Sequence, residues 1–162
     1  MSHKHLATYL NDHLAGAVTA IDLLSHLESA YAGTDPAGWA ADLRADIEAD
    51  RRELEGLMAR WGVSQSPPRK ASAWVGEKLA ELKLRLDDPA AGAFRLMETT
   101  EAVSLGIEGK RSLWRSLAAA AEQSADLRGV DYDRLIRRAE DQRGRAEAVR
   151  LEAAKAALAA GK

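Results

Sequence analysis

Three side chains of types that bind metal ions or transfer protons fall on apolar helical stripes of this sequence: His13, Asp50 and Glu101. His13 stands within a repeat of apolar residues at steps of three and four, the spacing of one buried helix face. Asp50 fills the one remaining slot in a second such repeat, and Glu101 lies on a third. Because mixed nitrogen and oxygen ligands suit zinc, manganese and iron, the three side chains form a candidate site for one Fe, Zn or Mn ion.

A structural role competes with this metal site. An isolated buried charge is costly, so His13 and Asp50 should have partners. If the helices that carry them fold back at Gly33, the two residues lie at similar heights. They can then hydrogen-bond, with Glu101 or Gln142 joining them, and so fix the helix register. An open pocket would instead permit acid–base catalysis by the His13–Asp50 pair. Simple exposure at a bundle edge is the remaining alternative.

Other catalytic chemistries lack the residues that they need. The chain has no cysteine, which excludes disulfides, cysteine-ligated zinc, iron–sulfur clusters and thiol catalysis. The segment SLGIEGKRSLW, residues 104–114, has the glycines and the lysine of a phosphate-binding loop, but such a loop needs a preceding strand and wider glycine spacing. Because this segment lies within a helical region, its glycines indicate close helix packing or a local kink.

The elements that position these side chains are expected to be helices. Alanine, leucine, arginine and glutamate dominate the composition, and no strand pattern is present. Asp35 and Asp88 can cap helices in which Pro36 and Pro89 take the first position. These signals and the apolar periodicity predict one domain with helices over residues 3–32, 36–61, 70–86, 89–123 and 132–159.

The loop lengths predict how these helices pack. Short loops join the first two helices and the last two, so each pair is expected to form an antiparallel hairpin. Residues 62–88, which include the short helix 70–86, can travel much of the bundle's length between the hairpins. The predicted fold is therefore an all-α bundle of two antiparallel hairpins joined by a long crossover.

This layout, with polar residues at mid-bundle, resembles the ferritin-like superfamily of four-helix bundles over nearly the whole chain. The resemblance implies a di-iron centre with a Glu on each of two helices and a Glu-x-x-His on each of the other two. The chain contains no Glu-x-x-His, and Ile47-x-x-Asp50 and Glu140-x-x-Arg143 take its place. Arginine cannot bind a metal ion, so the chain resembles a degenerate member without that centre.

The charge pattern argues against two classes of partner. Lys+Arg 23 against Asp+Glu 25 gives a net charge of -2, and the arginines within residues 137–150 alternate with acidic residues. A nucleic-acid interface needs a clustered basic face, so we expect no nucleic acid. No apolar run reaches the roughly 18 residues of a membrane span, and no signal peptide heads the chain. We therefore expect a cytoplasmic protein that does not enter a membrane.

The function that the sequence favours is association. Strong scaffold signals without a catalytic motif are typical of a non-enzymatic bundle that forms a homo-oligomer or binds a protein partner. The apolar stripe of helix 70–86 needs cover from its own bundle, from a partner or from a second copy. The alternative is a metal-binding bundle with an oxidoreductase or metal-handling role. The sequence leaves open whether Gln142 or Arg143 faces the core.

Overall fold

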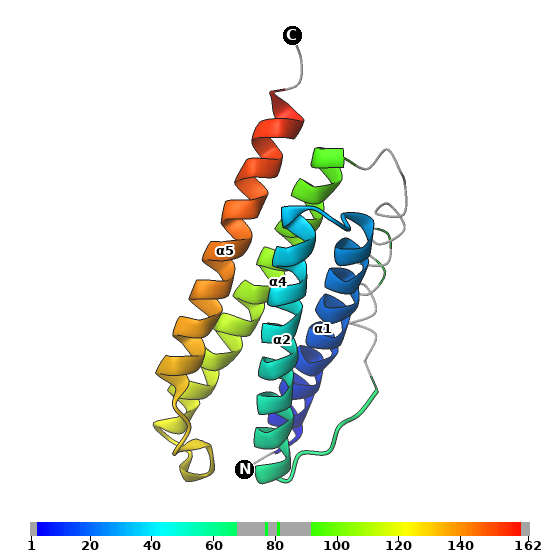
Figure 1. Cartoon of the computed structure of the whole chain (residues 1–162). Helices are drawn as coiled ribbons and strands as arrows, with labels where there is room; N and C mark the ends of the chain where they lie inside the picture. Colours follow the sequence, from blue (N-terminus) through cyan, green and yellow to red (C-terminus); the bar gives the residue numbers. More distant parts are fainter. Residues whose placement is uncertain (1–2, 68–76, 78–80, 82–91, 160–162) are drawn as a thin grey trace.

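The computed structural model describes residues 3–67, 77, 81 and 92–159, and every long element in this part of the chain is a helix (Figure 1). Four long helices form the molecule: α1 (His3–Ala30), α2 (Asp35–Arg60), α4 (Gly92–Ala121) and α5 (Tyr132–Leu158). A short 3₁₀ helix, η1 (Ala125–Leu127), lies between the last two. The described residues contain no strand, so the all-α prediction is confirmed. The helix predicted over residues 70–86 lies outside the described residues except for Glu77 and Glu81, and so does the predicted start at residue 89.

The ends of the helices follow local backbone chemistry. Gly33, Gly62 and Gly129 have φ values of 80°, 66° and 77°, a region that only glycine enters without strain, and each stands beyond the end of a helix. Asp131 caps α5 by accepting a hydrogen bond of 2.9 Å from the backbone N–H of Arg134. The cap predicted at Asp35 is wrong. Thr34 holds that position, and its hydroxyl donates to the Tyr31 carbonyl instead.

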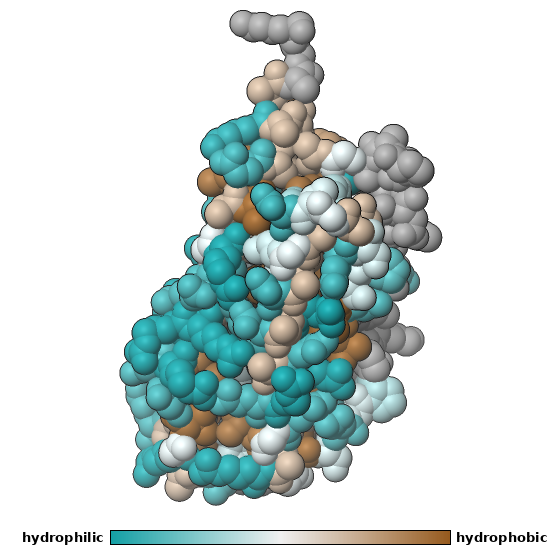
Figure 2. All heavy atoms as spheres, in the orientation of Figure 1, coloured by the Kyte–Doolittle hydropathy of each residue, from teal (hydrophilic) through white to brown (hydrophobic). Residues whose placement is uncertain are grey.

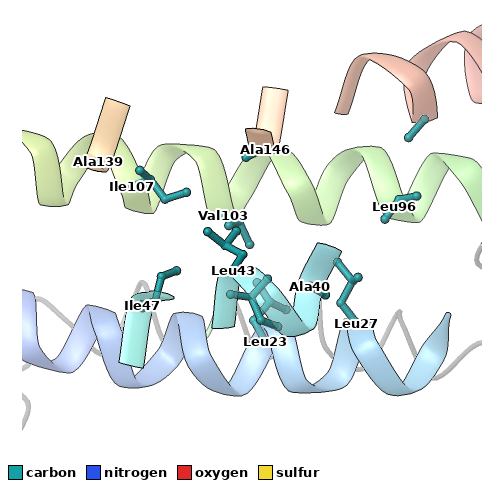
Figure 3. Close-up of a cluster of buried hydrophobic side chains, with 12 residues drawn as sticks. Leu23, Leu27, Ala40, Leu43, Ile47, Leu96, Val103, Ile107, Ala139 and Ala146 are labelled. Carbon is teal, nitrogen blue, oxygen red and sulfur yellow. The ribbon is translucent and has the colours of Figure 1, made fainter. Parts of the chain in front are cut away.

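Two apolar clusters form the core, one toward each end of the bundle as drawn in Figure 1. We call them the upper and the lower cluster. Figure 3 shows part of the upper cluster, where Val103 of α4 points toward Leu43 of α2 and Leu23 of α1. The buried upper residues are Leu23, Leu24, Leu27, Ala40, Leu43, Ile47, Leu96, Val103, Ile107, Ala139, Ala146 and Ala153. The buried lower residues are Leu10, Leu14, Leu54, Met58, Trp61, Val63, Leu113, Trp114, Leu117, Leu127, Tyr132 and Leu135.

Membership of the clusters fixes the direction of each helix. The lower cluster takes residues from the start of α1 and α5 and from the end of α2 and α4. Helices α1 and α5 therefore run one way, and α2 and α4 run the other way (Figure 1). The packing is most extensive within the α1–α2 pair and the α4–α5 pair, which confirms two antiparallel hairpins. Helix α2 ends at the lower cluster, and α4 begins at the upper one.

Candidate functional site

A charged group of side chains separates the two apolar clusters, and Asp50 of α2 is its centre. Asp50 is 4% exposed, and its Oδ2 accepts hydrogen bonds from Lys110 Nζ at 2.5 Å and from Gln142 Nε2 at 2.9 Å. Its Oδ1 lies 3.1 Å from Nε of Arg138. Lys110 also donates to the Gln142 side-chain carbonyl. We call Asp50, Lys110, Arg138 and Gln142 the polar layer. It joins three helices, α2, α4 and α5.

Helical periodicity brings these side chains into the core. Asp50 stands between Ile47 of the upper cluster and Leu54 of the lower one, at steps of three and four. Lys110 stands in the same way between Ile107 and Trp114. Both residues therefore occupy core positions of amphipathic helices, where a charge persists only with a partner. The core position predicted for Asp50 is confirmed, and the same spacing identifies Lys110, which was not among the predicted site residues.

The polar layer is a closed network. Burial lowers the pKa of Lys110, while the neighbouring Asp50 carboxylate raises it and Arg138 lowers it further. A lysine with a lowered pKa can serve as a base or a nucleophile where a substrate can reach it. Here the ammonium donates to both Asp50 and Gln142, and Gln142 is 0% exposed. The geometry therefore fits a network that holds three helices together better than a reactive centre.

Two further ion pairs extend the polar layer along the line between α2 and α5. Arg145 pairs with Asp46 on one side of the layer, and Arg134 pairs with Glu53 on the other. Arg138 donates in addition to the backbone carbonyl of Asp46 at 3.2 Å. In Figure 2, hydrophilic residues cover much of the surface over α5 and the lower part of α2. This side of the bundle is thus polar both at its surface and where the helices meet.

His13 lies apart from the polar layer. It stands on α1 next to Leu14 of the lower cluster, half-buried, and packs edge-to-face on Tyr9 with ring centroids 4.7 Å apart. Burial lowers its pKa, and the nearby Asp12 raises it. No hydrogen bond or ion pair joins His13 to Asp50, although both are described; Asp50 bonds α4 and α5 instead.

The predicted level of His13 along the bundle is also wrong. The register of α1 against α2 differs from the one that a turn centred on Gly33 implies. Glu28 pairs with Arg44 at 3.1 Å, and halfway between them in sequence is Pro36 rather than Gly33. A turn centred on Gly33 would therefore place Asp50 nearer the start of α1 than the structure does. In the structure, Asn11 bonds to the Ser64 carbonyl beyond the end of α2, so His13 lies at the level of that end.

Glu101 is exposed. Its side chain is 58% exposed and lies 3.7 Å from Arg150 on the outer side of α4 and α5. Phe94 and Leu105, which lie on the same side of α4 as Glu101, are exposed as well. The structure thus does not bring His13, Asp50 and Glu101 together. Within residues 3–67, 77, 81 and 92–159, no group of three His, Cys, Asp or Glu side chains could hold a metal ion.

The positions that correspond to a di-iron centre do not fit one either. Gln142 faces the core, which settles the alternative that the sequence left open. Arg143 points outward and pairs with Glu108 at 2.5 Å, and this contact is the main cause of a lowered pKa of Glu108. Glu140 is also on the outside, paired with Arg111 at 3.0 Å. The Glu140-x-x-Arg143 segment is therefore a surface ion-pair segment.

The outer side of the α4–α5 hairpin carries a second feature, an apolar face. Its members are Phe94, Leu105, Leu151 and Leu158, which are 46%, 70%, 45% and 69% exposed. Phe94 and Leu105 are eleven residues apart on α4, and Leu151 and Leu158 are seven apart on α5, so each pair shares one helix face. We call these four residues the α4–α5 apolar face. Apolar residues surround much of α4, so their spacing alone does not distinguish this exposed side from the buried one.

Over the described residues, no helix is both long enough and apolar enough to cross a membrane. Comparison of the chain with models of protein families, with curated proteins and with solved structures finds no match in any of the three.

Proposed function

We propose that this protein is a non-enzymatic helical bundle that works by associating with another protein molecule through the α4–α5 apolar face. The observation that supports this most directly is the exposure of four large apolar side chains on one side of one hairpin. Exposed apolar side chains scattered singly are common, so the proposal rests on four of them lying on one side of the same hairpin. A partner that covers these side chains gains the free energy of removing them from water.

The interior supports a scaffold role. The charged groups of the polar layer satisfy one another across three helices, so the layer contributes to the architecture without offering a reactive group to a substrate. We propose further that the architecture is ferritin-like, with the crossover expected from the sequence, because α2 and α4 run in the same direction. A cytoplasmic location is part of the same proposal.

The metal-binding alternative has a direct test. A single Fe, Zn or Mn ion would need ligands that converge, and the three candidates lie on different parts of the bundle. We expect no stoichiometric metal in protein purified without chelator, measured by elemental mass spectrometry. A stoichiometric ion that disappears in His13→Ala would contradict the proposal and favour the metal-handling role.

Site-specific photocrosslinking in cells tests the proposed surface. A benzophenone amino acid replaces Leu105 in one variant and Val18 in another. Val18 is an apolar residue of α1, 45% exposed and outside the α4–α5 apolar face, so it serves as a matched control. We expect a discrete crosslinked product from position 105 and none from position 18. A position 105 that gives no product beyond the control would overturn the proposal.

A further inference from the structure

The chain leaves α2 at the lower end of the bundle and passes toward the side where α1 lies (Figure 1). Residues 63–66 of this segment, which we call the strap, lie outside any helix and are bound to α1. We infer that Asn11 of α1 is the anchor of the strap: without its side-chain amide, the strap separates from α1 while the long helices stay folded. The inference does not depend on the proposed function, because it concerns a contact within one chain.

The first residue of the strap is fixed by the way in which α2 ends. Gly62, with its positive φ, follows the helix cap Trp61, and its N–H donates to the Ala59 carbonyl at 3.2 Å. The N–H of Val63 donates to the Met58 carbonyl at 2.8 Å. These two bonds form a Schellman motif, in which the residue after the glycine packs against the last turn of the helix. Val63 is accordingly 7% exposed and belongs to the lower cluster.

Beyond Val63, hydrogen bonds to Asn11 hold the strap. The side chains of residues 64–67 are exposed, so burial of apolar surface does not hold this part of the chain. Nδ2 of Asn11 donates to the Ser64 carbonyl at 3.1 Å, and its Oδ1 accepts from the backbone N–H of Ser66 at 2.8 Å. Both bonds go to the backbone of the strap, on either side of Gln65. One side chain of α1 therefore satisfies two backbone groups that lie outside secondary structure.

Asn11 in turn needs the strap. It is 8% exposed and stands next to Leu10 and near Leu14, two buried residues of the lower cluster. Its Nδ2 also donates within α1, to the Ala7 carbonyl at 2.8 Å, whereas its Oδ1 takes its donor from the strap. A buried amide oxygen that loses its donor is costly. The strap and the amide thus satisfy each other, which explains a polar residue at this buried position.

The other end of the connection between the hairpins is bound near the opposite end of α1. The hydroxyl of Tyr31, directly after α1, donates to the carbonyl of Gly92, the first residue of α4, at 2.7 Å. This contact is a single exposed bond, whereas Asn11 makes two partly buried ones. We therefore assign the larger share in holding the strap to Asn11.

Amide hydrogen exchange of the full chain, followed residue by residue by NMR, tests the inference. Asn11→Leu removes both bonds and leaves no buried amide oxygen without a donor, so α1 is expected to keep its packing. We expect the Ser66 N–H to exchange at least about tenfold faster than in the wild type, because opening of the strap no longer breaks these bonds. The N–H of Trp114, buried in α4, should change by less than about twofold.

Two variants serve as matched controls. Thr19→Val removes a side-chain hydrogen bond within α1, from the Thr19 hydroxyl to the Ala15 carbonyl at 2.9 Å. Tyr31→Phe removes the bond at the other end of the connection. In both controls the exchange of Ser66 should stay within about twofold of the wild type. Asn11→Ser, whose single hydroxyl cannot make both bonds to the strap, provides a second test variant if Asn11→Leu does not fold.

The outcomes decide whether Asn11 acts locally. Faster exchange at Ser66 without faster exchange at Trp114 supports the anchor. An unprotected Ser66 N–H in the wild type would overturn it, and so would an equal acceleration in Thr19→Val or full protection of Ser66 in the Asn11 variants. Equal acceleration at Ser66 and Trp114, or unfolding of both Asn11 variants, would overturn it too, because the amide would then stabilise the whole bundle.

Discussion

Charged side chains join helices at two places in this bundle, and the two places differ in exposure. In the polar layer, Asp50 meets Lys110 and Arg138 with its carboxylate almost fully buried. On the outer side of α4 and α5, Glu101, Glu108 and Glu140 meet arginines with carboxylates that are largely open to water. The chemical types are the same. Their exposure to water differs, so the free energy of forming a charge pair differs between the two places.

The difference teaches what each set of charges can contribute. Burial removes the hydration of a charge, and the attraction to its partners offsets this loss only when the geometry is good. The buried pairs are therefore a poor source of net stability, but breaking one of them is costly. The exposed pairs lose little hydration and gain little, typically under about 1 kcal/mol each. The polar layer fixes which helices meet, whereas the outer pairs hold α4 against α5 at the surface.

Removing the central carboxylate should have the largest effect. We expect Asp50→Leu to lower the free energy of unfolding by about 3–5 kcal/mol, because Lys110 and Arg138 lose the buried charge that compensates them. Denaturant unfolding followed by circular dichroism measures this change. Asp46→Asn is the matched control on the same helix, since the Asp46–Arg145 pair is far more exposed. A loss no greater than that of the control would contradict a special role for the layer.

Replacing the layer as a unit should remove this loss of stability. In Asp50→Leu/Lys110→Met/Arg138→Met/Gln142→Leu none of the four positions carries a charge, and we expect stability within about 1 kcal/mol of the wild type or up to about 4 kcal/mol higher. The same unfolding experiment gives the result. A quadruple variant as unstable as Asp50→Leu would show that the layer itself supplies net stability.

The pH dependence of stability should carry the signature of Lys110. Its pKa in the folded protein is below the ordinary 10.5, because burial outweighs the attraction of Asp50. Between the two pKa values the unfolded chain binds more protons, so the free energy of unfolding rises with pH toward 10.5 and then levels off. The difference between wild type and Lys110→Met isolates this effect. Tyr31 and Tyr132, whose pKa values burial raises, contribute equally to both proteins. A difference that stays flat or falls with pH would be the contrary result.

The exposed pairs should give the smallest effect. We expect Glu108→Gln and Arg143→Gln each to change the free energy of unfolding by less than about 1 kcal/mol. The double variant should differ little from the sum of the two, and added salt should reduce the difference from wild type. A loss comparable with that of Asp50→Leu would remove the contrast between the two places.

Sequence reasoning succeeds here where one helix decides the outcome. The long helices and the core position of Asp50 follow from spacing within single segments. It fails where two segments must be placed against each other. Apolar residues surround much of α4, so the stripe with Glu101 and Leu105 could not be told from the buried one until α5 and α1 were in place. The height of His13 depended on a hairpin register that Gly33 alone does not fix.

Lys110 was missed for a different reason. Its glycine-rich neighbourhood suggested a loop motif, and its place between Ile107 and Trp114 was overlooked. A lysine at a core position needs a carboxylate from another helix, and Asp50 was already identified as a core carboxylate without a cation. Pairing such positions by charge would have predicted the central contact of the polar layer.

Photocrosslinking in cells, with a benzophenone amino acid at the position of Leu105 and at that of Val18 as the control, tests the central claim most directly. If the α4–α5 apolar face binds another protein molecule, position 105 gives a discrete crosslinked product and position 18 gives none. The contrary result is a position 105 that gives no product beyond the control.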